Sequence, residues 1–220
     1  MDYKLLGKNT KLNFTKEVFE NRGMSASDMI RYLNTTDSDI INYNNLDNIT
    51  EAAQLYAKHL NNNSPILLVV DPDVDGLTSS SLLYNFTKRI WKKANLDYVM
   101  HGSKMHGLTD DVNINVDKYK LIILPDAGSN QFELHKELSE KGIDVLVLDH
   151  HHTEKYSEYA IVVNNQLSEN YSNKSLSGVG VVWQFLRALN ETERLGEDMS
   201  YFLDVVAGGL VADLMDLRSI

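Results

Sequence analysis

The chain's 220 residues are enough for one large domain or two small ones, and a hydrophobic content of 43% is ordinary for a globular core. The lack of cysteine excludes disulfides and thiolate metal sites, and no apolar run approaches the roughly 20 residues that a membrane span needs. A formal net charge of −10 at pH 7 argues against a broad basic face for nucleic acid. Nucleic acid would then be held by a local patch or by bound cations, and we expect a soluble, cytoplasmic protein with no membrane contact.

The first 64 residues are predicted to form a helical lead-in. Helical patterns cover about 15–20, 28–33 and 50–60, with loops rich in Asn, Asp and Thr between them. Ser25 or Ser27 is expected to cap the second helix, and Thr50 the third. Because Pro65 and the asparagines before it end the third helix, we expect residues 1–64 to pack as a unit on a core that begins at residue 65.

Strands and helices alternate from residue 65 onward. Apolar runs predict strands over 66–70, 119–124, 144–148 and 160–163, and residues 97–100 are a short strand candidate. Helical patterns lie between and after them, over 77–94, 131–141, 177–190 and 198–215. This alternation predicts an α/β fold: a doubly wound, mostly parallel sheet of about five strands, flanked by helices.

Acidic and imidazole side chains follow three of the predicted strands. Asp71, Asp73 and Asp75 come after the first, Asp126 after the third, and Asp149-His150-His151 after the fourth. The carboxyl ends of parallel strands share one edge of a sheet, so these groups are expected to meet there. If residues 71–75 continue as an extended run, their three carboxylates share a face and surround one ion. Oxygen ligands of this kind suit Mg²⁺ or Mn²⁺.

Other interpretations of these residues are available. Asp126 alone is typical of a turn or cap, and paired histidines occur on solvated surfaces. A calcium loop counted from Asp71 is excluded, because its twelfth position holds Leu82 instead of glutamate. Asp213 lies in an apolar helical pattern and needs a partner, either a metal or a cap or arginine contact. On spacing alone, Asp204 is an equal candidate.

Taken together, five motifs resemble the DHH phosphoesterases. They are Asp71-Pro72-Asp73-Val74-Asp75-Gly76, Asp126-Ala127-Gly128, Asp149-His150-His151, Ser177-Gly178-Val179-Gly180 and Gly209-Leu210-Val211-Ala212-Asp213. That family includes RecJ single-strand exonucleases, phosphodiesterases of small RNAs and cyclic dinucleotides, and manganese pyrophosphatases. The helical lead-in resembles RecJ proteins in particular.

The resemblance implies a centre of two divalent cations, Mn²⁺ or Mg²⁺. Asp73 would hold one cation, Asp75, His150 and Asp213 the other, and Asp126 would bridge them. His151 would contact the scissile phosphate as a catalytic residue. Asp149 would assist by orienting an imidazole, and Asp71 would support the first loop. The residues implied to bind substrate phosphate are Ser177, Gly178, Gly180 and Lys104.

Two positions depart from the family pattern. Lys104 stands where the family has an arginine, and a lysine lacks the bidentate fork. Leu210 stands where threonine is usual. The chain is expected to comprise the lead-in, 1–64, and the DHH catalytic domain, 65–220, without the family's C-terminal substrate-binding domain.

The resemblance implies 5′–3′ exonuclease activity on single-stranded DNA in repair or recombination. A single-strand-binding protein or a helicase is a candidate partner. Two alternatives remain open from the sequence: a phosphodiesterase of oligonucleotides or cyclic dinucleotides, and an inactive domain that only binds metal or a partner.

Overall fold

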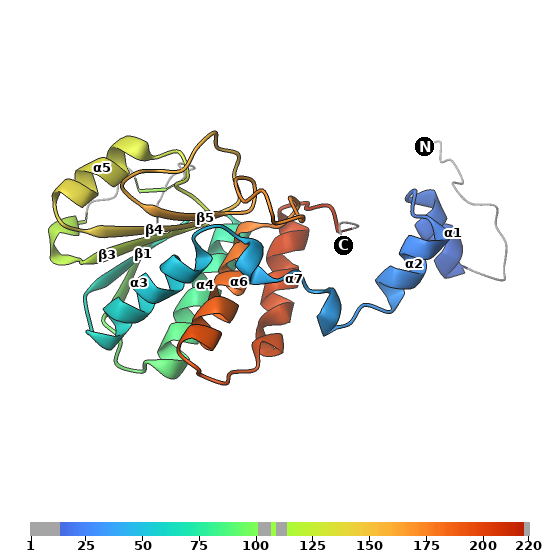
Figure 1. The fold of residues 1–220 in the computed structure, drawn as a ribbon, viewed down its shortest axis with the longest axis horizontal. Coiled ribbons are helices and arrows are strands. Elements are labelled where there is room, and N and C mark those ends of the chain that lie inside the picture. The colour runs from blue at the N-terminus through green and yellow to red at the C-terminus, as the bar shows by residue number, and fades with distance from the viewer. Residues whose placement is uncertain (1–13, 101–106, 109–113, 218–220) are drawn as a thin grey trace, which may run out of the picture. The chain divides into compact units, whose positions relative to one another are not determined.

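The computed structural model describes residues 14–100, 107–108 and 114–217, and these fall into two compact units (Figure 1). One unit comprises Asn42–Met215 and contains the sheet; the other takes in the described parts of Met1–Ile41 and Asp216–Ile220. The third predicted helix therefore groups with the sheet. The predicted packing of the lead-in on the core stays a prediction.

The amino-terminal unit contains two short helices, α1 (Phe14–Asn21) and α2 (Ala26–Leu33). The Ser25 side chain accepts a hydrogen bond from the Asp28 amide at 3.1 Å, so Ser25 is the cap of α2. Gly23 has a φ of 78°, a left-handed conformation that glycine adopts readily after a helix end. Both local features match the predicted cap and stop.

Five parallel strands form one sheet in the order β2-β1-β3-β4-β5. Their bounds are β1 Ile66–Val70, β2 Leu96–Met100, β3 Leu121–Pro125, β4 Asp144–Asp149 and β5 Ile161–Asn164. Every residue of β1 and β3 is buried, as expected for strands covered on both faces. The predicted α/β class and parallel sheet are confirmed.

Helices cover both faces of this sheet (Figure 1). They are α3 (Ile49–Asn61), α4 (Val74–Ile90), α5 (Phe132–Glu140), α6 (Gly178–Thr192) and α7 (Leu203–Ala212). In Figure 1, α5 lies on one side of the strands and α3, α4 and α6 on the other, with α7 packed against α4 and α6. None of the helices in the described ranges is both long and apolar enough to cross a membrane.

The order of the strands reverses between β1 and β3. The chain leaves β1 through α4 to reach β2 on one side, and it leaves β3 through α5 to reach β4 on the other. Because such crossovers are right-handed, the two helices lie on opposite faces, and a crevice opens at the carboxyl ends of β1 and β3. The acidic residues that follow these two strands are placed at this crevice.

Side-chain hydrogen bonds shift two predicted helix starts. Asn48 precedes α3 with a φ of 63° and donates through Nδ2 to the Val162 carbonyl, and the helix begins at Ile49, one residue before the expected cap, Thr50. Asp198 accepts from the Ser200 amide at 2.9 Å and starts a short 3-10 turn, Met199–Phe202. The continuous helix predicted over 198–215 is therefore wrong, and α7 begins only at Leu203.

Candidate metal centre

Carboxylates and imidazoles from β1, β3, β4 and α7 converge at the carboxyl edge of the sheet. They form three overlapping trios whose ligand atoms lie within 4.8 Å of one another in each trio. The trios are Asp71, Asp73 and Asp126; Asp75, His150 and Asp213; and Asp126, His150 and His151. The convergence predicted from the strand ends is therefore present in the structure.

The three aspartates after β1 do not share one face. The strand ends at Val70 and α4 begins at Val74, so the expected extended run of 71–75 is wrong. Asp73 is the cap of α4 and accepts from the Gly76 amide at 2.9 Å, whereas Asp75 lies within the first helical turn. The start of the helix thus directs Asp73 and Asp75 to two different trios.

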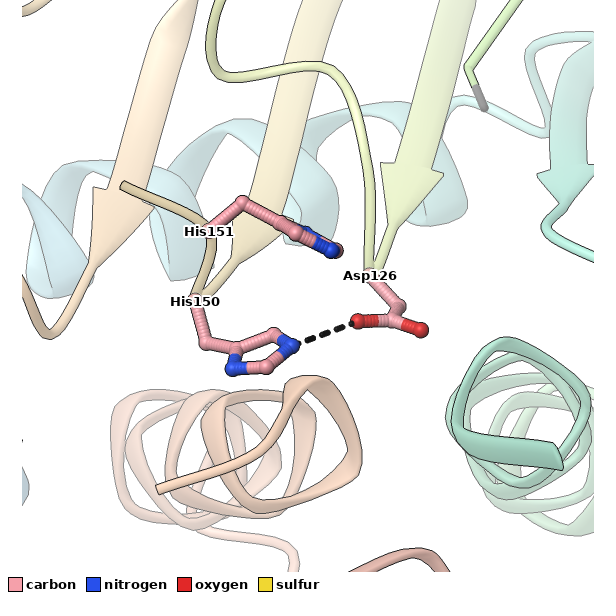
Figure 2. Close-up of side chains that lie close together, drawn as sticks. All are labelled: Asp126, His150 and His151. Carbon is pink, nitrogen blue, oxygen red and sulfur yellow. Dashed lines mark ion pairs between the residues drawn. The ribbon is translucent and has the colours of Figure 1, made fainter. Parts of the chain in front are cut away.

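Asp126 is buried at the centre of the cluster. Its φ is 62°, a left-handed conformation that aspartate tolerates better than most residues, and its amide donates to the Leu148 carbonyl at 2.8 Å. Its Oδ1 has no hydrogen-bond partner among the described residues and lies 3.2 Å from His150 Nε2 (Figure 2). Burial, together with the nearby charge of Asp75, raises the pKa of Asp126 to about 10.

His150 is the point at which the ligand atoms meet. Its Nε2 lies 3.2 Å from Asp126 Oδ1, 3.5 Å from Asp213 Oδ2 and 3.8 Å from Asp75 Oδ2. Asp213 Oδ2, like Asp126 Oδ1, is buried and has no hydrogen-bond partner within the described ranges. Two orphaned carboxylate oxygens beside one imidazole nitrogen fit a divalent cation, which would satisfy both oxygens and offset their charge.

The structure separates Asp213 from Asp204. Asp213 directly follows α7 and reaches His150, whereas Asp204 is exposed in the first turn of the helix and accepts from the Val205 amide at 2.8 Å. At 1.5 Å per residue, the two aspartates are about 13 Å apart along α7. Asp204 is therefore excluded as the group that joins this cluster.

Asp149 holds the histidine loop. Its Oδ1 accepts from the amides of His150 and His151 at 2.7 and 3.1 Å and lies 2.7 Å from His151 Nδ1, while Oδ2 accepts from the Ser129 amide at 3.0 Å. Burial opposes ionisation, but these hydrogen bonds and the charge of His151 outweigh it and lower the pKa of Asp149. In Figure 2 the rings of His150 and His151 both extend toward Asp126.

The amino end of α6 bonds to Asp75. Asp75 Oδ2 accepts from the Gly178 amide at 2.6 Å, and Oδ1 accepts from the Val179 amide at 3.1 Å. Ser177, Gly178 and Gly180 are buried. The Gly178 amide is thus used by a carboxylate; phosphate binding by Ser177, Gly178 and Gly180 stays a prediction, and Lys104 lies outside the described residues.

Glycines allow the helices to approach the carboxylates closely. A Cβ on Gly178 would lie 2.4 Å from Asp126 Oδ1, and one on Gly209 would lie 2.6 Å from Asp75 Oδ1. On Gly76 it would lie 2.4 Å from the Asp71 Cβ. Since a side chain at any of these positions would displace an acidic residue, the glycines define where the carboxylates lie.

Two further residues support the centre. The Asn164 side chain donates to Ser129 Oγ and to the His151 carbonyl, both at 2.9 Å, and so ties the end of β5 to the histidine loop. Sequence reasoning assigned no role to Asn164 or Ser129. The sequence did offer a signal for Asn164, because it comes directly after a predicted strand as the acidic groups do. The contact of Ser129 depends on tertiary structure alone.

Comparisons with known proteins agree with this geometry. The family model of the DHH family, N-terminal domain, matches residues 65–210. Over 223 aligned residues the chain is 44% identical to YorK of Bacillus subtilis (strain 168), a prophage-derived protein provisionally named as a single-strand DNA-specific exonuclease. It is 30% identical over 204 residues to the single-stranded-DNA-specific exonuclease RecJ of the same organism.

These relatives are much longer than this chain. The alignment covers 100% of the chain but 38% of YorK, and 90% of the chain but 25% of RecJ. A crystal structure of exonuclease RecJ bound to manganese has a TM-score of 0.67 and 28% identity, covering 77% of this chain and 44% of that one. The matched domain and the geometry at its strand ends show that the chain belongs to the DHH family.

Proposed function

We propose that this chain carries the catalytic centre of a metal-dependent phosphodiesterase that degrades single-stranded DNA from an end. The observation that carries the proposal is the pair of buried carboxylate oxygens, Asp126 Oδ1 and Asp213 Oδ2. They have no hydrogen bonds among the described residues and face His150 Nε2 at 3.2 and 3.5 Å. A buried acidic cluster of this kind needs a cation to stay ionised.

The trios support two cation positions. Asp75, His150 and Asp213 would hold one cation, and Asp73 the other, with Asp126 between them as the bridge. This division is supported by the membership of the trios, since Asp126 groups with Asp73 in one and with His150 in another. Mn²⁺ or Mg²⁺ fits a donor set of carboxylates with one imidazole.

When bound, the cations would supply an activated water and neutralise charge on the phosphodiester. Two residues of the chain, Asp149 and His151, would position the phosphate. Despite burial, hydrogen bonds lower the pKa of Asp149, so its carboxylate accepts at the contact with His151 Nδ1. The same contact raises the pKa of His151 and favours the imidazolium, whose Nε2–H would donate to a phosphate oxygen.

The substrate class rests on the relatives. The names of YorK and RecJ both specify single-stranded DNA, and all of this chain aligns with part of YorK. We assign residues 65–220 as the catalytic domain and residues 1–64 as its lead-in, with cleavage in the 5′–3′ direction by resemblance. A single-strand-binding protein or a helicase remains the candidate partner.

The test combines metal binding with cleavage of end-labelled strands. We expect calorimetry to find two Mn²⁺ sites in the wild-type chain, and 5′-labelled single-stranded DNA to be shortened from that end. Asp126→Ala should abolish cleavage and weaken Mn²⁺ binding, whereas Asp204→Ala, which changes an exposed carboxylate, should do neither. Preference for dinucleotides would indicate the oligonucleotide phosphodiesterase instead, and Mn²⁺ binding without turnover would indicate the binding-only alternative.

A further inference from the structure

A groove of 390 Å³ lies between α4 and the outer strand β2. Val70, Leu77 and Met100 line it, as do Tyr84 and Tyr98. Val70 directly precedes Asp71, and Leu77 lies in the first turn of α4, so the groove opens beside the metal centre. Its volume falls within the range of about 300–1,000 Å³ typical of small-molecule sites.

The apolar walls follow from the register of β1 and β2. Leu68 pairs with Tyr98 and Val70 with Met100, and all four side chains line the face that α4 partly covers. Because β2 is the outermost strand, its side chains on this face remain accessible: Tyr98 is 66% and Met100 53% exposed. Tyr84 meets Tyr98 edge to face at a centroid distance of 5.9 Å.

A buried hydroxyl in the groove wall has no partner. Ser80 lines the groove and is 3% exposed, and its Oγ makes no hydrogen bond with any described residue. A buried hydroxyl without a partner is unfavourable, and a bound molecule that offers a donor or an acceptor would satisfy it. Ser81 and Asn85 add exposed polar groups along the same side of α4.

One lysine lies beside the tyrosines of the groove. Lys88 Nζ lies 5.6 Å from the centroid of Tyr84 and donates to the Ala94 carbonyl at 2.6 Å, and the exposed Lys92 and Lys93 follow closely along the chain. In a chain of net charge −10, these lysines form a short basic stretch of sequence that begins beside Tyr84. Cations at a helix end also offset the helix dipole, but the adjacent tyrosines add the apolar surface that bases need.

We propose that this groove receives bases of the single strand next to the scissile phosphodiester, an inference that rests on the proposed function. Tyr98 and Tyr84 would stack on or flank the bases, Ser80 Oγ would bond to a base edge, and Lys88 would hold a backbone phosphate. Such a combination of aromatic faces and cations suits single strands with little sequence preference.

The test measures strand binding separately from cleavage. Fluorescence anisotropy in EDTA would compare a labelled eight-nucleotide oligothymidylate across variants of the full chain. Tyr98→Ala should weaken binding roughly tenfold, as expected for the loss of one stacked base. Tyr98→Phe, which keeps the ring, should bind as the wild type does. Tyr159→Ala removes a comparably exposed tyrosine, 42% accessible and outside the groove, and should also be neutral.

Ser81→Trp fills the groove from an exposed position and should weaken binding without lowering the melting temperature. Equal binding by the wild type, Tyr98→Ala and Ser81→Trp would overturn the inference, and so would a wild type that binds no oligothymidylate. Association of wild-type chains that Tyr98→Ala abolishes would assign the groove to a second copy instead. Mn²⁺-dependent cleavage of a thymidine nitrophenyl phosphodiester, which is too short to fill the groove, would still report on the proposed function.

Discussion

At the scale of single residues, the positions of the acidic side chains depend on glycines, which have no Cβ. Gly178 and Gly209 bring α6 and α7 so close to Asp126 and Asp75 that no Cβ fits between them. These contacts join residues far apart in the sequence. The convergence of the acidic groups could be predicted from the strand ends, but the need for glycine could not, because it depends on the final approach of the helices.

Two neighbouring glycines of α7 give a direct test. A Cβ at Gly209 would lie 2.5 Å from Val179 Cγ1 and 2.6 Å from Asp75 Oδ1, whereas one at Gly208 would meet nothing within 4 Å. We expect Gly209→Ala to lower the free energy of unfolding by about 1–3 kcal/mol through overpacking and to weaken Mn²⁺ binding. Gly208→Ala should stabilise the helix by up to about 1 kcal/mol and leave Mn²⁺ binding unchanged.

Denaturant melts in EDTA and Mn²⁺ calorimetry would measure the two effects. If Gly209→Ala bound Mn²⁺ as tightly as Gly208→Ala does, the proposed position of Asp75 as a ligand would be wrong.

At the scale of elements, the strands were predictable and the helix starts less so. The strands agree with their predicted bounds to within two residues. For β1 and β3 the reason is that β-branched and leucine runs buried on both faces have little alternative. The starts of α3 and α7 were missed because Asn48 and Asp198 bond to backbone groups. A capping hydrogen bond also explains why the pattern of alternate residues did not separate Asp73 from Asp75. Because Asp73 caps α4, the helix begins between the two aspartates.

Helix α5 carries a titratable group in the core. His135 is 0% exposed, neither ring nitrogen has a hydrogen-bond partner in the described part of the chain, and burial lowers its pKa to about 4. Between pH 6.5 and 4 the unfolded chain binds a proton that the folded chain does not. Relative to a variant that lacks this histidine, the free energy of unfolding should therefore fall as the pH falls through this window, by up to about 3 kcal/mol.

Chemical denaturation across that pH range would measure the effect in EDTA. The loss should be absent in His135→Leu and retained in His152→Gln, which alters an exposed histidine. A wild type and a His135→Leu variant with parallel pH profiles would contradict the assignment.

At the scale of the whole molecule, the buried acidic centre lowers the stability of the cation-free fold, and cation binding would offset this loss. At neutral pH, folding without a cation buries Asp126 in an environment that raises its pKa to about 10, so the folded state must take up a proton or hold an unfavourable anion. The folded pKa lies above the unfolded value, so the contribution of Asp126 to stability in EDTA falls as the pH rises above about 4. Bound cations would offset the charge of Asp126 and so raise the free energy of unfolding again.

Asp126→Asn separates the two effects. Asparagine keeps the shape and tolerates the left-handed backbone but carries no charge, so in EDTA at pH 8 the variant should melt at a higher temperature than the wild type. With Mn²⁺ at a hundred times its dissociation constant, the wild type should gain about 2.7 kcal/mol, and the variant much less. Melting curves with and without Mn²⁺ would measure both effects. A variant less stable than the wild type in EDTA would contradict the proposal that the buried charge of Asp126 destabilises the cation-free fold.

The proposed ligands extend along the chain from Asp73 to Asp213, the residue that directly follows α7. During translation, at about 5–20 residues per second, the nascent chain would carry the first ligand for roughly 7–28 s before the last is made. The sheet could form in that interval, but the second cation position would still lack one of its carboxylates. A centre built in this order is complete only after residues 74–212, which include β2 to β5 and most of the helices, have been synthesised.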